Sequence, residues 1–243
     1  MNVVMTAGGR IDGAYAAEAG TTIKALVEVR GETMLARAIA AARGTGGTKI
    51  AVVGGDDVRA ACGAAVDVVV PESESGAENL TRALRTWPGD EPLLFLTTDL
   101  PYISGDVLAA FLAAAPSDAL AMPLATPDAF YARFPGAPPV GITLGGERVV
   151  NGGAFLFPAG YAELVIGAAT KFFDARKSPW KMAALLGASL AWRFATKRLT
   201  VSGLEEAAPR RFGVAIKAVR QCAPELCFDA DTVEDYRYVS GHV

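Results

Sequence analysis

Residues 93–101 read Leu-Leu-Phe-Leu-Thr-Thr-Asp-Leu-Pro, an apolar run that ends in a carboxylate and a proline. Uninterrupted apolar runs are typical of strands in parallel sheets, because helices cover both faces of such sheets. Residues 104–115 follow with a helical pattern, and Ser104 can cap the first turn of that helix. The stretch therefore predicts a buried strand, a turn that carries Asp99, and a helix.

The same alternation of strand and helix extends from this stretch to the N-terminus. Apolar runs and caps predict strands at 2–5, 49–53 and 67–70 and helices at 33–43, 57–65 and 79–85. Strands separated by helices of this length form βαβ units, and their sheet is mostly parallel. We therefore expect an α/β protein with a Rossmann-like, three-layer α/β/α architecture.

The C-terminal half has a less regular pattern. It predicts strands at 121–123, 140–144, 154–157 and 214–219, a helix-rich region at 161–190 with a break near 178–179, and helices near 205 and at 231–238. No repeat, low-complexity tract or linker interrupts the 243 residues. We expect one domain over 1–243, with an N-terminal half at 1–112 and a C-terminal half at 113–243.

The composition argues against several classes of function. A net charge of −3 gives no basic surface for nucleic acid. The longest apolar runs, at 182–192 and 107–115, are shorter than the roughly 18 residues that span a bilayer, so we expect no membrane partner. No targeting segment stands at the N-terminus, which favours a cytoplasmic protein. The three cysteines lack metal-site spacing, and His242 is the only histidine, so a His-dependent hydrolase triad is not expected.

A glycine pair follows the first predicted strand. Residues 6–10 read Thr-Ala-Gly-Gly-Arg, and paired glycines let backbone N–H groups approach a phosphate closely, although they also suit an ordinary tight turn. The segment from Gly8 to about Ile23 is expected to be a long loop, and such loops in a compact domain tend to be functional. Lys24 follows at the edge of an apolar stretch, where the alternative to a functional role is a solvated surface lysine.

Carboxylates stand where a ligand could bind. Asp99 ends a predicted strand, and in open α/β sheets ligands lie beyond the carboxyl ends of the strands. There it could hold Mg²⁺ that also contacts triphosphate oxygens, or it could belong to the turn alone. Asp229 and Asp231 would share one face of a strand, although Asp231 or Thr232 could instead cap the last helix.

Five segments in a fixed order resemble a known family. They are the Ala-Gly-Gly turn, Lys-Ala-Leu-Val at 24–27, Thr-Asp-Leu-Pro at 98–101, Asn-Gly-Gly-Ala-Phe-Leu-Phe at 151–157, and Asp-Ala-Asp-Thr-Val-Glu-Asp at 229–235. This order resembles the MobA-like nucleotidyltransferases, which have a GT-A-type Rossmann-like fold. The group includes molybdenum-cofactor guanylyl- and cytidylyltransferases and, more distantly, sugar-phosphate nucleotidyltransferases. Little in residues 158–227 matches the pattern.

The resemblance implies roles for the N-terminal loop. Ala7, Gly8 and Gly9 would wrap the triphosphate, while Arg10 and Lys24 would neutralise it. The family loop usually reads Gly-Gly-x-Gly-x-Arg with a lysine a few residues further on. Here Arg10 follows the glycines directly and Lys24 lies 14 residues beyond it. The register of the loop is therefore open.

The resemblance also implies metal ligands. Asp99, which follows Thr98 in the Thr-Asp-Leu-Pro segment, would be one carboxylate for Mg²⁺. Asp231 matches the second carboxylate best, and Asp229 is the alternate. The family's proline in this last segment is replaced by Val233, which changes the entry to the helix but not the charge.

Two further segments would contact the substrates. Gly76 and Asn79 lie in a segment that resembles the loop and helix facing the nucleobase. Asn151 and Gly152 resemble the segment on the acceptor side.

A basic segment between the two halves of the helix-rich region has no counterpart in the pattern. It comprises Lys171, Arg176, Lys177 and Lys181, with aromatic residues between them. It is either a solvated face with aromatics packed inward or part of a site for an anionic acceptor.

The resemblance thus implies a Mg²⁺-dependent nucleotidyltransferase that binds a nucleoside triphosphate in the half 1–112 and a small phosphorylated acceptor in the half 113–243. A homodimer is one option for its oligomeric state. One alternative is a regulatory domain that binds a nucleotide without catalysis. Another is a dinucleotide-dependent oxidoreductase, although the first strand is not followed by the Gly-x-Gly-x-x-Gly spacing that such an enzyme requires.

Overall fold

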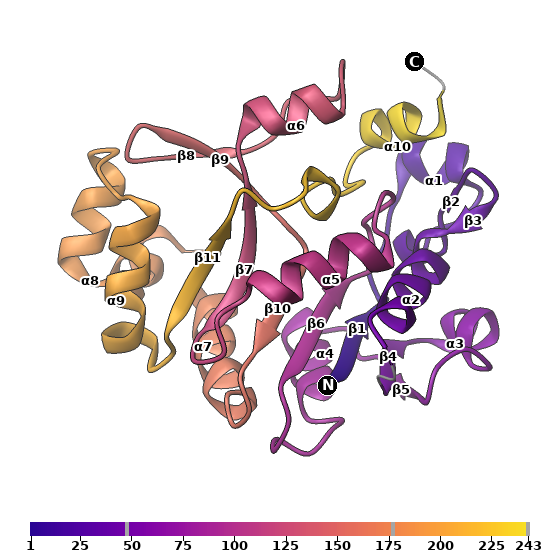
Figure 1. The fold of residues 1–243 in the computed structure, drawn as a ribbon, viewed down its shortest axis with the longest axis horizontal. Coiled ribbons are helices and arrows are strands. Elements are labelled where there is room, and N and C mark those ends of the chain that lie inside the picture. Colours follow the sequence, from indigo (N-terminus) through magenta and orange to yellow (C-terminus); the bar gives the residue numbers. More distant parts are fainter. Residues whose placement is uncertain (47–48, 176–177, 242–243) are drawn as a thin grey trace.

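Side chains of the first strand point alternately to the two faces of a central sheet. Val3 and Met5 of β1 (Asn2–Thr6) belong to one hydrophobic cluster and Val4 to another, as the two-residue period of a strand requires. The first cluster includes α2 (Met34–Gly44) and α5 (Gly105–Ala114), and the second includes α4 (Gly76–Leu84) and α7 (Ala162–Ala175). The computed structural model, which describes residues 1–46, 49–175 and 178–241, therefore confirms three α/β/α layers (Figure 1).

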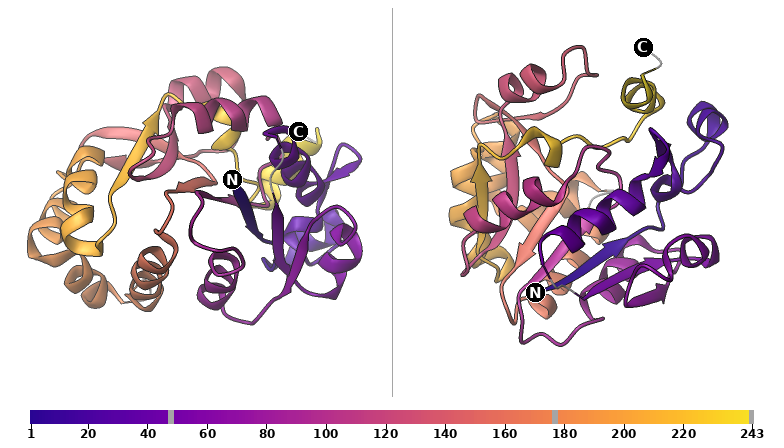
Figure 2. Two further views of the ribbon diagram at one scale, coloured as in Figure 1. Left: turned by 60° about the horizontal axis from the view of Figure 1, so that its bottom comes forward. Right: turned by 45° about the vertical axis from the view of Figure 1, so that its right-hand side comes forward.

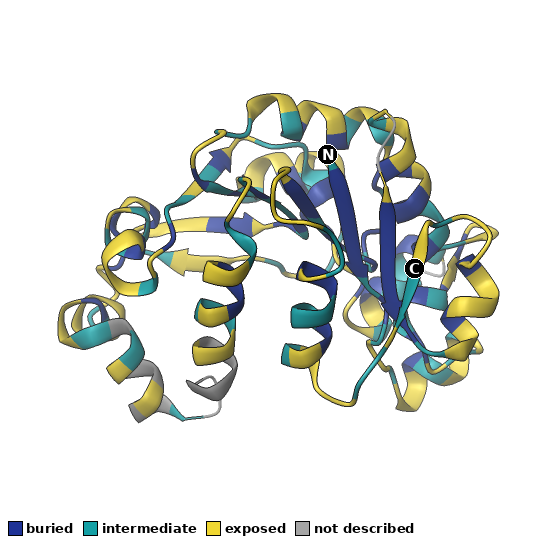
Figure 3. Cartoon of the chain, turned by 90° about the horizontal axis from the view of Figure 1, so that it is seen from below, coloured by how far each residue is buried: buried dark blue, intermediate teal, exposed yellow. Residues whose placement is uncertain are grey.

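The N-terminal half of the sheet is parallel. Four strands lie in the order β5-β4-β1-β6, and each pairs with its neighbour in parallel register. They are β1, β4 (Ile50–Gly54), β5 (Val68–Pro71) and β6 (Leu93–Thr97). Figure 3 shows the central strands buried along most of their length. The four carboxyl ends therefore meet at one edge of the sheet, which is where the predicted ligand residues stand.

The C-terminal half makes the sheet mixed. Strand β10 (Ala154–Phe157) runs antiparallel between β6 and β7 (Leu120–Ala125), and β11 (Ile216–Arg220) pairs in parallel with β7. A hairpin of β8 (Ile142–Leu144) and β9 (Glu147–Asn151) pairs with the end of β7 through β9, on the same edge as β10 and opposite β11. A separate short ribbon pairs β2 (Glu28–Val29) with β3 (Glu32–Thr33).

The remaining helices surround this sheet (Figure 2). They are α1 (Gly13–Ala19), α3 (Asp56–Cys62), α6 (Pro127–Arg133), α8 (Pro179–Ala195), α9 (Val201–Phe212) and α10 (Val233–Ser240), with short 3₁₀ turns η1 (Lys24–Leu26) and η2 (Pro224–Leu226). Ser104 caps α5, and Thr232, rather than Asp231, caps α10. Within the described residues, none of the helices combines the length and the apolar character needed to cross a bilayer.

Two helices depart from the sequence-based expectations. The segment expected to be a long loop between Gly8 and Ile23 contains α1, which buries Tyr15 and ends at Gly20 in a left-handed conformation. The alanines of this segment favour a helix once a tertiary contact anchors it. Helix α6 was not expected either, although Thr126 caps it and Pro127 stands at its first position.

Candidate functional site

The glycine turn after β1 is closely packed. The N–H of the buried Ala7 donates to the carbonyl oxygen of Val53 at 2.8 Å, which fixes the turn to the neighbouring strand. A Cβ atom on Gly8 would lie 2.3 Å from a carboxylate oxygen of Glu72. The carbonyl oxygen of Gly9 accepts a hydrogen bond from the N–H of Lys24 at 3.0 Å. After α1 the chain therefore comes back to the glycine turn, and Lys24 lies beside Gly9.

Lys24 joins two carboxylates from distant parts of the chain. Its Nζ atom lies 2.6 Å from Oδ2 of Asp99 and also contacts Oδ1 of Asp231. Asp99 follows β6, whereas Asp231 stands just before α10. The backbone connects them as well, because the N–H of Ala230 donates to the carbonyl oxygen of Asp99 at 3.0 Å. The structure thus brings together three residues that the sequence marked as candidate ligands.

The charges of this cluster shift the pKa values of its members. Burial acts to lower the pKa of Lys24, but the negative charges of Asp99 and Asp231 raise it above its usual range. Burial acts to raise the pKa of Asp231, yet its hydrogen bond and ion pair with Lys24 lower it overall. Desolvation and repulsion by Asp231 and Asp99 raise the pKa of Asp229. Lys24 is therefore cationic and Asp231 anionic at neutral pH, while Asp229 takes a negative charge less readily.

The donor set suits Mg²⁺ that also has ligands from a nucleotide. Protein-bound Mg²⁺ usually takes one or two carboxylates and completes its shell with phosphate oxygens and water. Asp99 and Asp231 supply two carboxylates around one ammonium group, and Asp229 lies beside them. Nowhere in the described part of the chain do three His, Cys, Asp or Glu side chains gather closely enough to hold a metal by themselves. Asp99 and Asp231 could therefore hold a metal ion only if a bound molecule or water supplied its other ligands.

Tyr15 fixes the loop that carries Asp229 and Asp231, and sequence reasoning missed it. Its hydroxyl donates to the carbonyl oxygen of Ala230 at 3.0 Å, and its ring stacks on Tyr236 of α10 with centroids 5.5 Å apart. Burial raises the pKa of Tyr15 to about 12, so the hydroxyl remains a donor. The two partners are 215 positions apart in the sequence, which explains why no local pattern reveals the contact.

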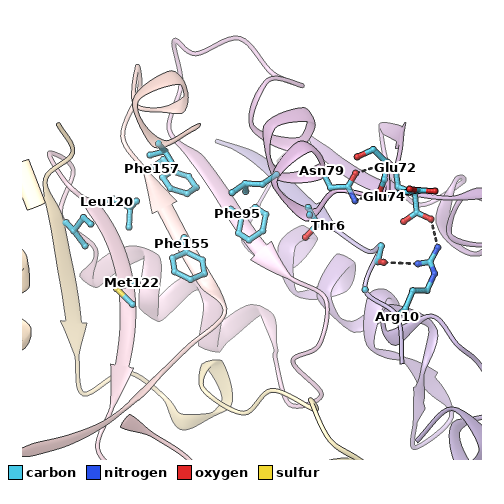
Figure 4. Close-up of a pocket in the computed structure, with 17 residues that line it drawn as sticks. Thr6, Arg10, Glu72, Glu74, Asn79, Phe95, Leu120, Met122, Phe155 and Phe157 are labelled. Atoms are coloured by element: carbon cyan, nitrogen blue, oxygen red, sulfur yellow. Dashed lines mark hydrogen bonds and ion pairs between the residues drawn. The ribbon is translucent and has the colours of Figure 1, made fainter. Parts of the chain in front are cut away.

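A groove of about 960 Å³ begins at the glycine turn (Figure 4). Its polar end is formed by the turn, Arg10, the loop after β5 and the start of α4. The rest of its wall is apolar and comes from α4, α7 and the strands β6, β10, β7 and β11: Leu80, Phe95, Leu120, Met122, Phe155, Phe157, Val165 and Ile216. A ligand of nucleotide size could therefore place phosphates at the glycines and a ring system deeper in the groove.

Arg10 contacts the loop after β5 and not the Lys24 cluster. Its Nη2 atom lies 2.5 Å from Oε1 of Glu72, and its Nη1 donates to the carbonyl oxygen of Gly8 at 2.9 Å (Figure 4). Glu72 was not among the sequence-predicted residues, since a lone glutamate after a strand carries no signal. The arginine and the lysine of the loop therefore stand on different sides of the glycine turn.

The side chain of Asn79 holds the loop at the polar end of the groove in place. Its side chain is buried, with its Oδ1 accepting from the N–H of Ser73 at 2.6 Å and its Nδ2 donating to the carbonyl oxygen of Ser73 at 2.9 Å. Gly76 begins α4, whose N-cap is Ser75. Both predicted residues line the groove, but the amide of Asn79 is already used to hold the loop.

A second, smaller pocket of about 460 Å³ adjoins the carboxylates. Asn151, Asp229 and Asp231 line it together with residues of the segment 138–142. Gly152 lines neither pocket, because it is buried where a Cβ would lie 2.3 Å from the carbonyl oxygen of Leu226. Of the two predicted residues, Asn151 therefore lines the second pocket, whereas Gly152 serves the packing of the backbone.

Thr98 and the described residues of the basic segment line neither of the two pockets. Thr98 is buried and its hydroxyl donates to the carbonyl oxygen of Thr6 at 3.0 Å, so it ties the ends of β6 and β1 together. In the basic segment, Lys171 and Lys181 are exposed, whereas Arg176 and Lys177 lie outside the described residues.

Comparisons with known proteins give a consistent family. The sequence model of the MobA-like NTP transferase domain matches residues 4–177. None of the proteins with curated functions matches the chain. A structure described as a hypothetical transferase from Thermus thermophilus is 27% identical, with a TM-score of 0.82 over 97% of this chain and 99% of that one.

Two more distant structures share the fold. A nucleotidyl transferase from Methanothermobacter thermautotrophicus is 18% identical, with a TM-score of 0.59 over 99% of this chain and 96% of that one. The 4-diphosphocytidyl-2C-methyl-D-erythritol synthase from Anaerococcus prevotii is 12% identical, with a TM-score of 0.58 over 99% and 94% of the two chains. Because the family model covers well over half of the sequence and includes the glycine turn, Lys24 and Asp99, the chain belongs to the MobA-like NTP transferase family.

Proposed function

We propose that the chain is a nucleotidyltransferase that moves a nucleoside monophosphate from a nucleoside triphosphate to a small phosphorylated acceptor, with release of pyrophosphate. The observation that carries the proposal is the contact of Lys24 with Asp99 and Asp231 directly beside the glycine turn. The ammonium group of Lys24 lies between two carboxylates, and the glycine turn and a groove of nucleotide size lie next to it. This arrangement suits a triphosphate that binds together with a metal ion.

In the proposed reaction an oxygen of the acceptor phosphate attacks the α-phosphorus in line. The bond from that phosphorus to the bridging oxygen breaks, and the electron pair leaves with pyrophosphate. The N–H groups of Gly8 and Gly9 and the ammonium group of Lys24 would hold the triphosphate and offset the charge that develops on it. Asp99 and Asp231, with Asp229 as the alternate, would hold Mg²⁺, which neutralises phosphate charge when bound.

The groove would receive the nucleoside, with the phosphates at its polar end and the base along its apolar wall. Glu72 and Asn79 lie at the polar end, and the apolar wall begins beside them (Figure 4). The second pocket would receive the acceptor, because Asn151 faces it and the carboxylates that would hold the metal form its other side. The two substrates would then meet at Lys24 and the carboxylates, which is the position that in-line transfer requires.

Thermal stabilisation by nucleotides tests the proposal first. ATP, GTP, CTP and UTP are each added with and without Mg²⁺, and the unfolding temperature is followed. We expect a Mg²⁺-dependent rise for one or two of the four, since a ligand that binds only the folded state stabilises it. Release of pyrophosphate is then measured with that nucleotide and a panel of phosphorylated acceptors.

The outcomes separate the competing functions. A nucleotide-specific rise followed by pyrophosphate release supports the transferase. Tight nucleotide binding without pyrophosphate release from any acceptor would instead support a regulatory nucleotide-binding domain. No rise with any of the four, at concentrations far above a micromolar Kd, would refute the triphosphate site.

A further inference from the structure

The second half of α8 carries the two most exposed large apolar side chains among the described residues. Trp192 is 67% exposed and Phe194 is 62% exposed. Both follow a bend at Gly187, where the helix leaves regular geometry with φ of 76°. Large apolar side chains that stand together in solvent commonly mark a surface that binds another molecule.

The helix after this bend is held from one side only. At 100° per residue, Trp192 shares a side with Ala188 and Ala195, both of which are exposed. Leu190 is buried and points in another direction, toward the rest of the protein. Phe194 follows Leu190 by one turn, so it lies on a different side of the helix from Trp192 and is exposed there. The two rings therefore stand on different sides of the helix end, and the described part of the chain leaves both of them largely uncovered.

Positive charges accompany the two aromatic rings. Arg193, Lys197 and Arg198 are all exposed, and none of the three forms an ion pair with a residue that the structure describes. Residues 188–200 contain no aspartate or glutamate. We call these five residues, Trp192, Arg193, Phe194, Lys197 and Arg198, the aromatic–basic tip. It concentrates positive charge in a chain whose net charge is −3.

The tip lies outside the part of the chain that defines the family. The family model ends at residue 177, and α8 and α9 lie at the opposite side of the molecule from α1 and α10 (Figure 1). The turn that follows the tip contacts the β8–β9 hairpin, where a Cβ on Gly145 would lie 2.4 Å from the side chain of Thr200. Ile142 at the start of that hairpin lines the second pocket. The tip thus has no part in the nucleotide site, but it shares a supporting hairpin with the second pocket.

We propose that the aromatic–basic tip docks the protein reversibly on an anionic membrane surface. Tryptophan and phenylalanine favour the boundary between lipid headgroups and acyl chains, and arginine and lysine beside them bind anionic headgroups. A symmetric contact with a second copy would place the same cations against each other, which disfavours that occupant. The mode is peripheral, so it requires no membrane-spanning helix, and none is found among the described residues.

Sedimentation with lipid vesicles tests the proposal. The full chain is mixed with vesicles of phosphatidylcholine alone and with vesicles that also contain phosphatidylglycerol, and the bound fraction is measured at low and high salt. We expect binding only when phosphatidylglycerol is present, with a loss at high salt as the charges are screened. Fluorescence should shift to shorter wavelength on binding and should lose that shift in Trp192→Phe.

Matched variants separate the tip from general surface effects. Trp192→Ser with Phe194→Ser, and separately Arg198→Glu, should each reduce the bound fraction at least severalfold. Leu164→Ser with Val68→Ser removes two exposed apolar side chains elsewhere, and Arg59→Glu reverses an exposed charge on α3; both should bind as the parent does. Circular dichroism checks that each variant is folded.

Three results would overturn the proposal. One is equal binding to both kinds of vesicle, or to neither. Another is unchanged binding by the tip variants. The third is binding to a DNA duplex or an acidic polypeptide, lost in the tip variants, with none to vesicles, because the surface would then serve a different class of partner. None of these results depends on the proposed nucleotidyl transfer.

Discussion

At the scale of single residues, Asp99 has the central role in the proposed chemistry, because it contacts Lys24 and would also hold the metal ion. Asp99→Asn keeps the size of the side chain but removes its charge, so it weakens both the contact with Lys24 and the proposed metal site. We expect pyrophosphate release to fall by about 10²-fold or more, the scale of losing one charge-stabilising group in a water-poor site. Asp106→Asn, at an exposed position in the first turn of α5, is the control and should leave the rate unchanged. Parent-like turnover by Asp99→Asn would show that this carboxylate holds no metal.

The hydroxyl of Tyr15 supports the carboxylates through the backbone. Tyr15→Phe leaves the carbonyl oxygen of Ala230 without its partner, which should cost about 1 kcal/mol of unfolding free energy. It should also weaken Mg²⁺-dependent stabilisation by a nucleotide, because Asp229 and Asp231 lose their fixed spacing. Tyr161→Phe removes a comparable hydroxyl–carbonyl bond, to the backbone of Asp118 at 2.9 Å, which does not involve the loop that carries Asp229 and Asp231. If both variants lose nucleotide stabilisation equally, Tyr15 has no special role in positioning.

At the scale of secondary structure, the turn between β1 and α1 depends on the absence of side chains. Gly8→Ala would push its methyl group against the carboxylate of Glu72 and so disturb the ion pair of Glu72 with Arg10. We expect nucleotide affinity, measured by titration calorimetry, to fall about tenfold or more while the protein remains folded. Gly167→Ala, in a helix with open space around it, should leave affinity unchanged. Unaltered affinity in Gly8→Ala would place the triphosphate elsewhere.

Elements that are buried on both faces could be predicted from the sequence, because their apolar runs leave little choice. The strand at 93–97 and the cap at Ser104 are found where the pattern placed them. Helix α1 could not be predicted in the same way. Its seven residues are too short to be helical alone, and they depend on packing of Tyr15 against α10.

The candidate site shows the same division between local and distant information. Lys24, Asp99 and Asp231 were found through motifs whose order matches a family, and the structure places them in contact. Glu72 and Tyr15 carry no motif of their own. Their partners lie 62 and 215 residues away, so only the folded chain shows what they hold.

At the scale of the whole molecule, α1 near the N-terminus and α10 near the end of the described chain contact each other beside the site. Besides the stack of Tyr15 on Tyr236, Glu18 of α1 forms an ion pair with Arg237 of α10. The chain between Gly9 and Lys24 and the chain that carries Asp229 and Asp231 therefore dock on each other beside the proposed triphosphate site. A ligand that bridges Lys24 and the carboxylates should stabilise both segments at once.

Hydrogen exchange with a bound nucleotide measures this coupling. With Mg²⁺ and the preferred nucleotide together, we expect slower exchange in residues 12–24 and 228–240, while α9, which packs on β11 at the opposite side of the molecule (Figure 1), keeps its rate. Mg²⁺ alone should change neither segment at millimolar concentration, because the described residues hold no preassembled metal cluster. Tyr15→Phe should break the link, so that 12–24 is still protected by the nucleotide but 228–240 is protected less. Protection of both segments by Mg²⁺ alone would mean that the carboxylates form a metal site before the nucleotide binds, and Lys24 would then have to leave them first.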